Sequence, residues 1–130
     1  MFNSNPYQKY QQNSVNSAGK GELTLILYDG AVKSIKQGIK FMEADKIQDV
    51  HNAIIKAQEI ITHLNETLNM EYEISGNLSS LYEYINRRLV EANLKKDKLI
   101  LGEALGLVAE LRDTWKEATR AAKPLIACGQ

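Results

Sequence analysis

The stretch that decides the fold is residues 45–70, DKIQDVHNAIIKAQEIITHLNETLNM. Its apolar residues recur in alternating steps of three and four, which is the spacing of one face of an α-helix. The resulting seven-residue repeat predicts packing against neighbouring helices at a shallow crossing angle, as in helix bundles. The residues on this face are Ile47, Val50, Ile54, Ala57, Ile61, Leu64 and Leu68.

Helical spacing continues on both sides of this stretch and is interrupted at three points. The interruptions predict helices over about 22–42, 45–70, 77–95 and 97–122. Ser75 or Asn77 is a candidate cap for the third helix, and Asp97 for the fourth. Because the connections are only a few residues long, consecutive helices are expected to be antiparallel neighbours. The predicted fold class is therefore all-α, an antiparallel up-down-up-down four-helix bundle.

Length and composition fit one domain with less regular ends. The chain has 130 residues, and its two prolines, Pro6 and Pro124, lie near the termini. Residues 1–18 are rich in Asn, Gln, Ser and Tyr and carry a single charge, which predicts a flexible N-terminal arm. We expect the bundle to occupy residues 19–123 and a C-terminal tail to follow over 124–130.

Charge and cysteine content exclude several classes of partner. The 16 Lys and Arg residues balance 16 Asp and Glu residues, so no net field favours nucleic acid. No apolar run approaches the length of a membrane span, which argues against membrane insertion. The lone Cys128 has no partner for an intrachain disulfide, as expected in a reducing compartment. These features predict a cytoplasmic protein.

The predicted first helix has two apolar faces, whereas a helix in a simple bundle needs one. Its main stripe is Leu25, Tyr28, Val32, Ile35, Ile39 and Met42. The second face combines large apolar residues with small ones that permit close approach of another backbone. It consists of Leu23, Leu27, Gly30, Ala31, Ser34, Gly38 and Phe41. This face predicts either a groove for a partner helix or packing under the arm or a neighbouring helix.

Signals for catalysis or metal binding are weak. His63 and Glu66 are three residues apart, but in the reverse of the Glu-x-x-His order that di-iron bundles use. The core stripes contain no carboxylate, and Gly19-Lys20-Gly21 is too short for a phosphate-binding loop. We expect no catalytic residue, no metal and no cofactor, and hence a protein that is not an enzyme.

Four segments follow the pattern of a known family. They are YQKYQQNSVNSA at 7–18, GELTLILYDG at 21–30, LYEYINRRLVEAN at 81–93 and LRDTWK at 111–116. Together they resemble the flagellin-specific flagellar export chaperones, whose members have a Tyr-x-x-Tyr-Gln-x-Asn tail followed by a Glu-Leu-x-x-x-Leu-Tyr entry to the first helix. One departure is Lys20, which stands where that family commonly has a proline.

The resemblance implies a cytosolic chaperone that binds the C-terminal segment of newly made flagellin. In that family the segment becomes helical on the chaperone, which prevents premature polymerisation and helps delivery to the flagellar type III export gate. Such a segment needs apolar grooves, and the second face of the first helix is one candidate. The implied contacts are Leu23, Leu27, Ala31 and Phe41, with close approach at Gly30, Ser34 and Gly38, and Tyr7, Tyr10 and Val15 from the arm.

Two other classes remain open from the residues alone. One is a regulatory four-helix bundle that binds another amphipathic helix, and the other is a metal-binding bundle. For the free protein we expect a monomer or a weak homodimer.

Overall fold

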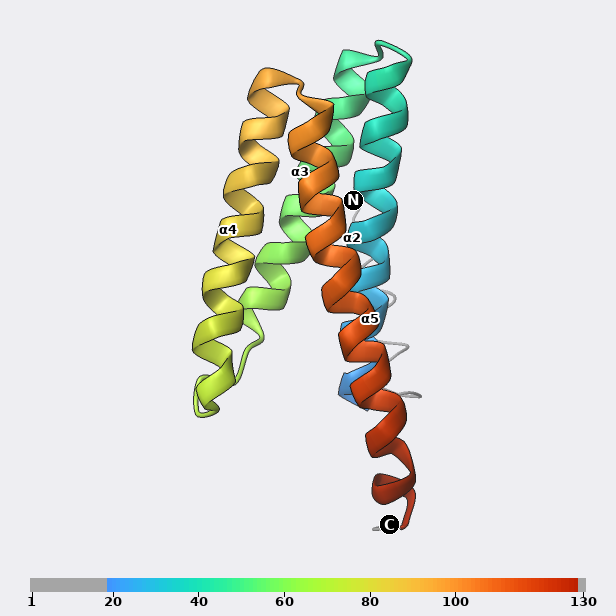
Figure 1. Ribbon diagram of the computed structural model, residues 1–130, viewed down its shortest axis with the longest axis vertical. Coiled ribbons are helices and arrows are strands. Elements are labelled where there is room, and N and C mark those ends of the chain that lie inside the picture. Colours follow the sequence, from blue (N-terminus) through green and yellow to red (C-terminus); the bar gives the residue numbers. More distant parts are fainter. Residues whose placement is uncertain (1–18, 129–130) are drawn as a thin grey trace, which may run out of the picture.

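The computed structural model describes residues 19–128, and for 19–20 and 121–128 only the path of the backbone. Regular structure within this range is entirely helical (Figure 1). The arm predicted over residues 1–18, with Tyr7, Tyr10 and Val15, lies outside the described residues. The helices are α2 (Gly19–Glu43), α3 (Ile47–Glu66), α4 (Glu73–Lys95) and α5 (Lys98–Cys128).

Consecutive helices run antiparallel, and α5 returns to pack beside α2 (Figure 1). Each helix therefore has two neighbours: α2 and α4 both pack against α3 and α5. Within the described residues, the diagonal pairs α2 with α4 and α3 with α5 make no backbone contact. This arrangement confirms the predicted all-α antiparallel four-helix fold.

Tight turns join the helices at the end of the bundle opposite Gly19. Asp45, between α2 and α3, and Lys96, between α4 and α5, have positive φ angles of 56° and 50°. Asp97 then caps α5, because its Oδ1 accepts hydrogen bonds from the backbone N–H of Leu99 (2.8 Å) and Ile100 (3.3 Å). The cap predicted at Asp97 is confirmed.

Other helix ends differ from the predicted ones. Helix α3 ends at Glu66, whereas the apolar repeat predicted a helix to residue 70. Helix α4 begins at Glu73 with Tyr72 as its N-cap, so neither Ser75 nor Asn77 caps it. The Ser75 hydroxyl instead donates to the carbonyl of Asn69 (2.6 Å) and ties the connection to the first turn.

Helix α5 also continues beyond its predicted end at about residue 122 and reaches Cys128. Pro124 therefore lies within a helix. A proline inside a helix removes one backbone hydrogen bond and its ring crowds the carbonyl four residues earlier, which is why an end near residue 122 was expected.

The core is built from all four helices. The stripe predicted on residues 45–70 is buried from Val50 to Leu64, whereas Ile47 is exposed and Leu68 packs against the core from beyond the helix end. None of the helices in the described range is long and apolar enough to cross a membrane. The largest fully buried side chains are Ile35, Val50, Ile54, Ile60, Ile61, Ile85, Leu89, Leu101 and Val108.

Candidate partner-binding surface

The second apolar face of α2 packs inside the bundle over much of its length. A Cβ atom added at Gly38 would lie 3.7 Å from Ala53 Cβ and Ile54 Cγ1 of α3, and 3.3 Å from Leu101 Cδ2 of α5. The small residues of this face thus let α2 approach its neighbours closely. Three more of its residues are buried, namely Leu27, Ala31 and Ser34.

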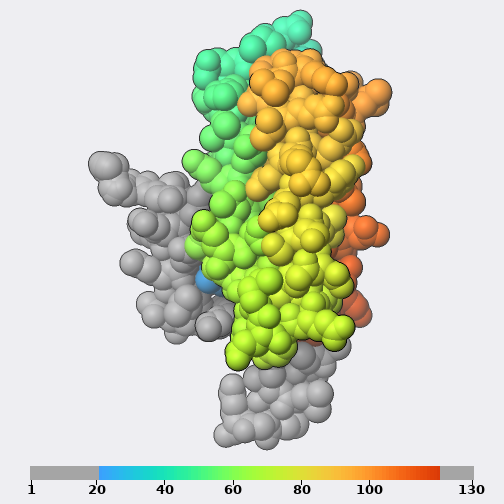
Figure 2. Space-filling view, turned by 90° about the vertical axis from the view of Figure 1, so that its left-hand side faces the viewer, coloured from blue at the N-terminus to red at the C-terminus, as the bar shows by residue number. Residues whose placement is uncertain are grey.

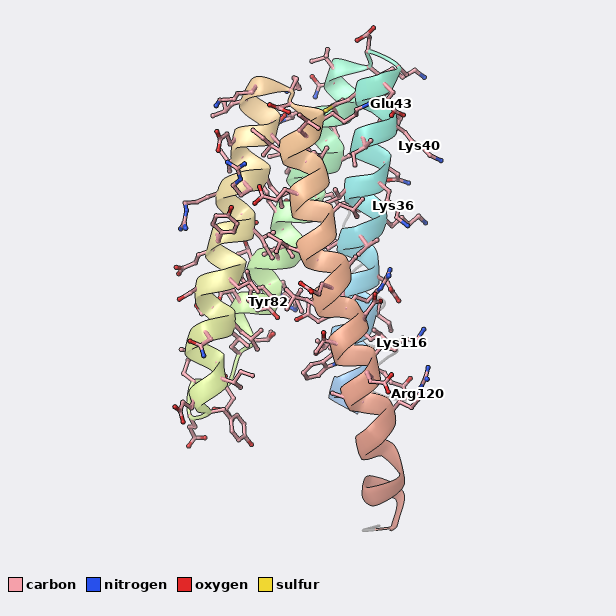
Figure 3. The ribbon with its side chains drawn as sticks, viewed as in Figure 1. Lys36, Lys40, Glu43, Tyr82, Lys116 and Arg120 are labelled. Carbon is pink, nitrogen blue, oxygen red and sulfur yellow. The ribbon has the colours of Figure 1, made fainter. Side chains whose placement is uncertain are left out.

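Only the outer edge of that face is accessible. Leu23, Gly30 and Phe41 are partly exposed, and the two larger side chains also contact the core. The charged side chains Lys36 and Lys40 of α2 lie outside this face and point away from the bundle (Figure 3). A partner that contacts α2 in this arrangement therefore meets an edge of the face and not its centre.

Two helix pairs are tied together at the end that carries the α3–α4 connection. In the pair α2 and α5, Trp115 Nε1 donates to the carbonyl of Gly21 (2.9 Å). In the pair α3 and α4, Asn86 Nδ2 donates to Thr62 Oγ1 (3.1 Å). Figure 2 shows α3 and α4 side by side as a continuous surface.

Helices α4 and α5 are linked through Glu103 of α5 and the middle of α4. Glu103 of α5 accepts hydrogen bonds from Tyr84 Oη and Arg88 Nε of α4, both at 2.7 Å. These bonds hold the pKa of Glu103 below its ordinary value, and the bond from Tyr84 has the largest effect. No other polar contact between the side chains of α4 and α5 is seen in the described range. Towards the α3–α4 connection the two helices lie apart in Figure 1.

Helical spacing places a strip of apolar side chains along the part of these helices where they diverge. On α5, Leu107 and Leu111 follow Glu103 in steps of four, so they continue the line that faces α4. On α4, Leu81 lies seven residues before Arg88 and continues the line that faces α5. We call the strip the open flank; it consists of Ile74, Leu78 and Leu81 of α4 with Leu107, Leu111 and Trp115 of α5.

The side chains of the open flank are more accessible than the core. Ile74 is 64% exposed, and the other five are partly buried and packed against the core cluster. An amphipathic helix that inserts its apolar side between α4 and α5 would cover this strip. Leu111 and Trp115 also have the helical spacing of core residues, and this spacing gives no information on where two helices diverge.

A pair of tyrosines lies behind the open flank. Tyr28 of α2 and Tyr82 of α4 are both 2% exposed, and their hydroxyl oxygens are 2.5 Å apart. Tyr82 points inward from α4 in Figure 3. Burial raises the pKa of both phenols, so both are protonated at neutral pH.

Within residues 21–120, no group of three or more His, Cys, Asp or Glu side chains is placed to hold a metal ion. His51 Nδ1 lies 2.9 Å from Asn93 Nδ2, in a contact between α3 and α4. The fold and the open flank define a small antiparallel helical bundle with a partly exposed apolar strip, a surface of the kind that amphipathic helices bind.

Comparison with known proteins identifies the family within that class. The profile of the family described as "Flagellar protein FliS" matches residues 3–122. The "Flagellar secretion chaperone FliS" of Bacillus subtilis is 48% identical over 114 residues, which cover 88% of this chain and 86% of that protein. The protein of the same name from Salmonella typhimurium is 34% identical, with 90% and 92% covered. The chain belongs to the FliS family of flagellar secretion chaperones.

Proposed function

We propose that this chaperone binds the C-terminal segment of flagellin in the cytoplasm and keeps it from polymerising before export. A segment that folds into an amphipathic helix on binding needs an accessible apolar strip, since burial of apolar surface offsets the entropy lost on ordering. The open flank supplies such a strip, and it is the observation that supports the proposal most directly.

The contact on α2 is proposed to lie at the exposed edge of its second face. Leu23 and Phe41 would touch the client there, with close approach at Gly30. Leu27, Ala31, Ser34 and Gly38 would support this edge from beneath, because they are packed within the bundle. The roles of Tyr7, Tyr10 and Val15 in covering the surface or clamping the client rest on the sequence alone.

Binding of flagellin with and without its C-terminal segment tests the client assignment. We expect full-length flagellin and the isolated segment to form a one-to-one complex with the chaperone in isothermal titration calorimetry. Flagellin that lacks the segment should show no heat of binding. Equal binding of the two flagellins would refute the assignment.

A matched pair of double variants tests the surface. Leu81→Asn with Leu111→Asn places two polar groups on the open flank and should weaken client binding at least tenfold. The control is Leu94→Asn with Leu99→Asn, which makes the same change at leucines that are 82% and 83% exposed beside the α4–α5 turn. The control should bind as the wild type does. Equal affinity of the two double variants would place the client elsewhere.

Delivery to the flagellar type III export gate is the proposed second step, and the free protein is proposed to be a monomer or a weak homodimer. Secretion of flagellin from cells that carry the open-flank variant should fall in proportion to the loss of binding. Analytical ultracentrifugation of the free chaperone measures the second property, and a stable dimer at micromolar concentration would contradict it.

A further inference from the structure

We propose that the hydrogen-bonded hydroxyls of Tyr28 and Tyr82 form a tether that holds α4 at a fixed distance from α2 and so keeps the open flank accessible to a client helix. This inference rests on the proposed function and adds a positioning role for two residues that have no access to the client themselves.

The tether joins two helices whose backbones do not approach each other. Helices α2 and α4 lie diagonally in the bundle and make no backbone contact within the described residues. The two phenols reach across the core, from positions 54 residues apart in the sequence. Each hydroxyl has the other as its partner, in a core cluster that is otherwise apolar.

A buried hydroxyl pair is a costly way to fill this space if packing is its only purpose. Two phenylalanines would occupy nearly the same volume without removing polar groups from water. What the hydroxyls add is a directional bond with a narrow range of length, which fixes the separation of the helices that carry it. The bond therefore specifies geometry more than it increases stability.

Its position ties this geometry to the open flank. Tyr82 follows Leu81 on α4, and Figure 3 shows it in the half of α4 that lies apart from α5. Tyr28 belongs to α2, and α2 is bonded to α5 through Gly21 and Trp115. The tether thus connects the pair α2 and α5 to α4 across the diverging end. Without it, the separation of α2 and α4 is no longer fixed at this level, and a shift of α4 towards α5 would bury Leu81 against Leu111.

Phenylalanine substitutions separate this role from plain packing. In Tyr28→Phe and in Tyr82→Phe one buried hydroxyl loses its partner, so the melting temperature should fall. In the double variant no hydroxyl is left unpaired, so the melting temperature should recover at least in part. Affinity for the C-terminal flagellin segment should not recover: we expect a loss of at least fivefold in the double variant as in the singles.

A distance measurement checks the proposed cause. Spin labels at Ser80 of α4 and Lys116 of α5, both exposed, report the separation at the diverging end after Cys128→Ser removes the native thiol. Double electron–electron resonance measures the distance between the two labels. It should show a shorter or broader distance distribution in the double phenylalanine variant. Labels at Leu94 and Leu99, beside the α4–α5 turn, serve as the control and should be unaffected.

The outcomes are distinct. A double variant that binds the segment within twofold of the wild type, or that leaves the distance between positions 80 and 116 unchanged, overturns the tether. If the wild type does not bind the segment, the proposed function itself fails, and the tether fails with it. A double variant with wild-type distance and weakened binding assigns the hydroxyls a different role and also overturns the inference.

Discussion

Replacing Gly38 by alanine measures how closely α2 approaches its neighbours. Alanine in a helix interior is more stable than glycine by about 1 kcal/mol. At Gly38 the added methyl would lie 3.3 Å from Leu101 Cδ2, a tight contact with a side chain that is fully buried. Crowding of the packed core by this methyl should cost about 1 kcal/mol. The gain in helix propensity and the cost of crowding should therefore cancel and leave the free energy of unfolding nearly unchanged.

Gly106 provides the matched control, since it is helical and an added Cβ there would meet no atom within 4 Å. Gly106→Ala should therefore gain the full ~1 kcal/mol. Gly38→Val adds a branched side chain at the crowded site and should lose about 2 kcal/mol. Urea unfolding followed by far-UV circular dichroism gives all three values. If Gly38→Ala stabilises as much as Gly106→Ala, the close approach of α2 to α3 and α5 is wrong.

Three further predictions concern stability. Leu27→Asp should unfold the bundle in a thermal melt because it buries an unpaired carboxylate at a site that is 4% exposed, and a variant that melts like the wild type would contradict the burial. Trp115→Phe should cost about 1 kcal/mol through loss of the bond to the Gly21 carbonyl, seen as a lower urea midpoint; an unchanged midpoint would show that the bond contributes nothing. The pKa of Glu103 is below its ordinary 4.5, so its ionised carboxylate stabilises the fold above that pH, and this stabilisation is lost as the pH falls through the folded pKa. Glu103→Gln should therefore reduce the decline of the urea midpoint below about pH 4.5. Parallel curves of urea midpoint against pH for the variant and the wild type would contradict this.

Local patterns were sufficient to predict the helices and much of the core. The stripe of residues 45–70 is buried from Val50 to Leu64, because its repeat exceeds the length needed to distinguish a helix from other structure. Asp97 acts as the predicted cap, since its short carboxylate bonds the first free N–H groups. Ser75 has the same capacity, but its hydroxyl bonds to the Asn69 carbonyl instead, because α4 already begins at Glu73 and Ser75 lies within its first turn.

The packing of the helices against one another could not be predicted from local sequence patterns. The periodicity of the second face of α2 leaves two possibilities open, a groove for a partner helix or packing under the arm or a neighbouring helix. The structure shows that much of the face packs inside the bundle, because α2 has two neighbours, α3 and α5. Leu111 and Leu81 have the spacing of core residues, and their partial exposure follows from the divergence of α4 and α5. Tyr28 belongs to the main apolar stripe of its helix, but its bond to Tyr82, 54 positions away, leaves no local signal.

Site-specific photo-crosslinking in the chaperone–flagellin complex tests the central claim most directly. A benzophenone side chain at position 111 lies on the open flank, and one at position 94 lies on a residue that is 82% exposed beside the α4–α5 turn. We predict a crosslink from position 111 to the C-terminal segment of flagellin and none from position 94. A crosslink from position 94 alone would show that the client does not bind at the open flank.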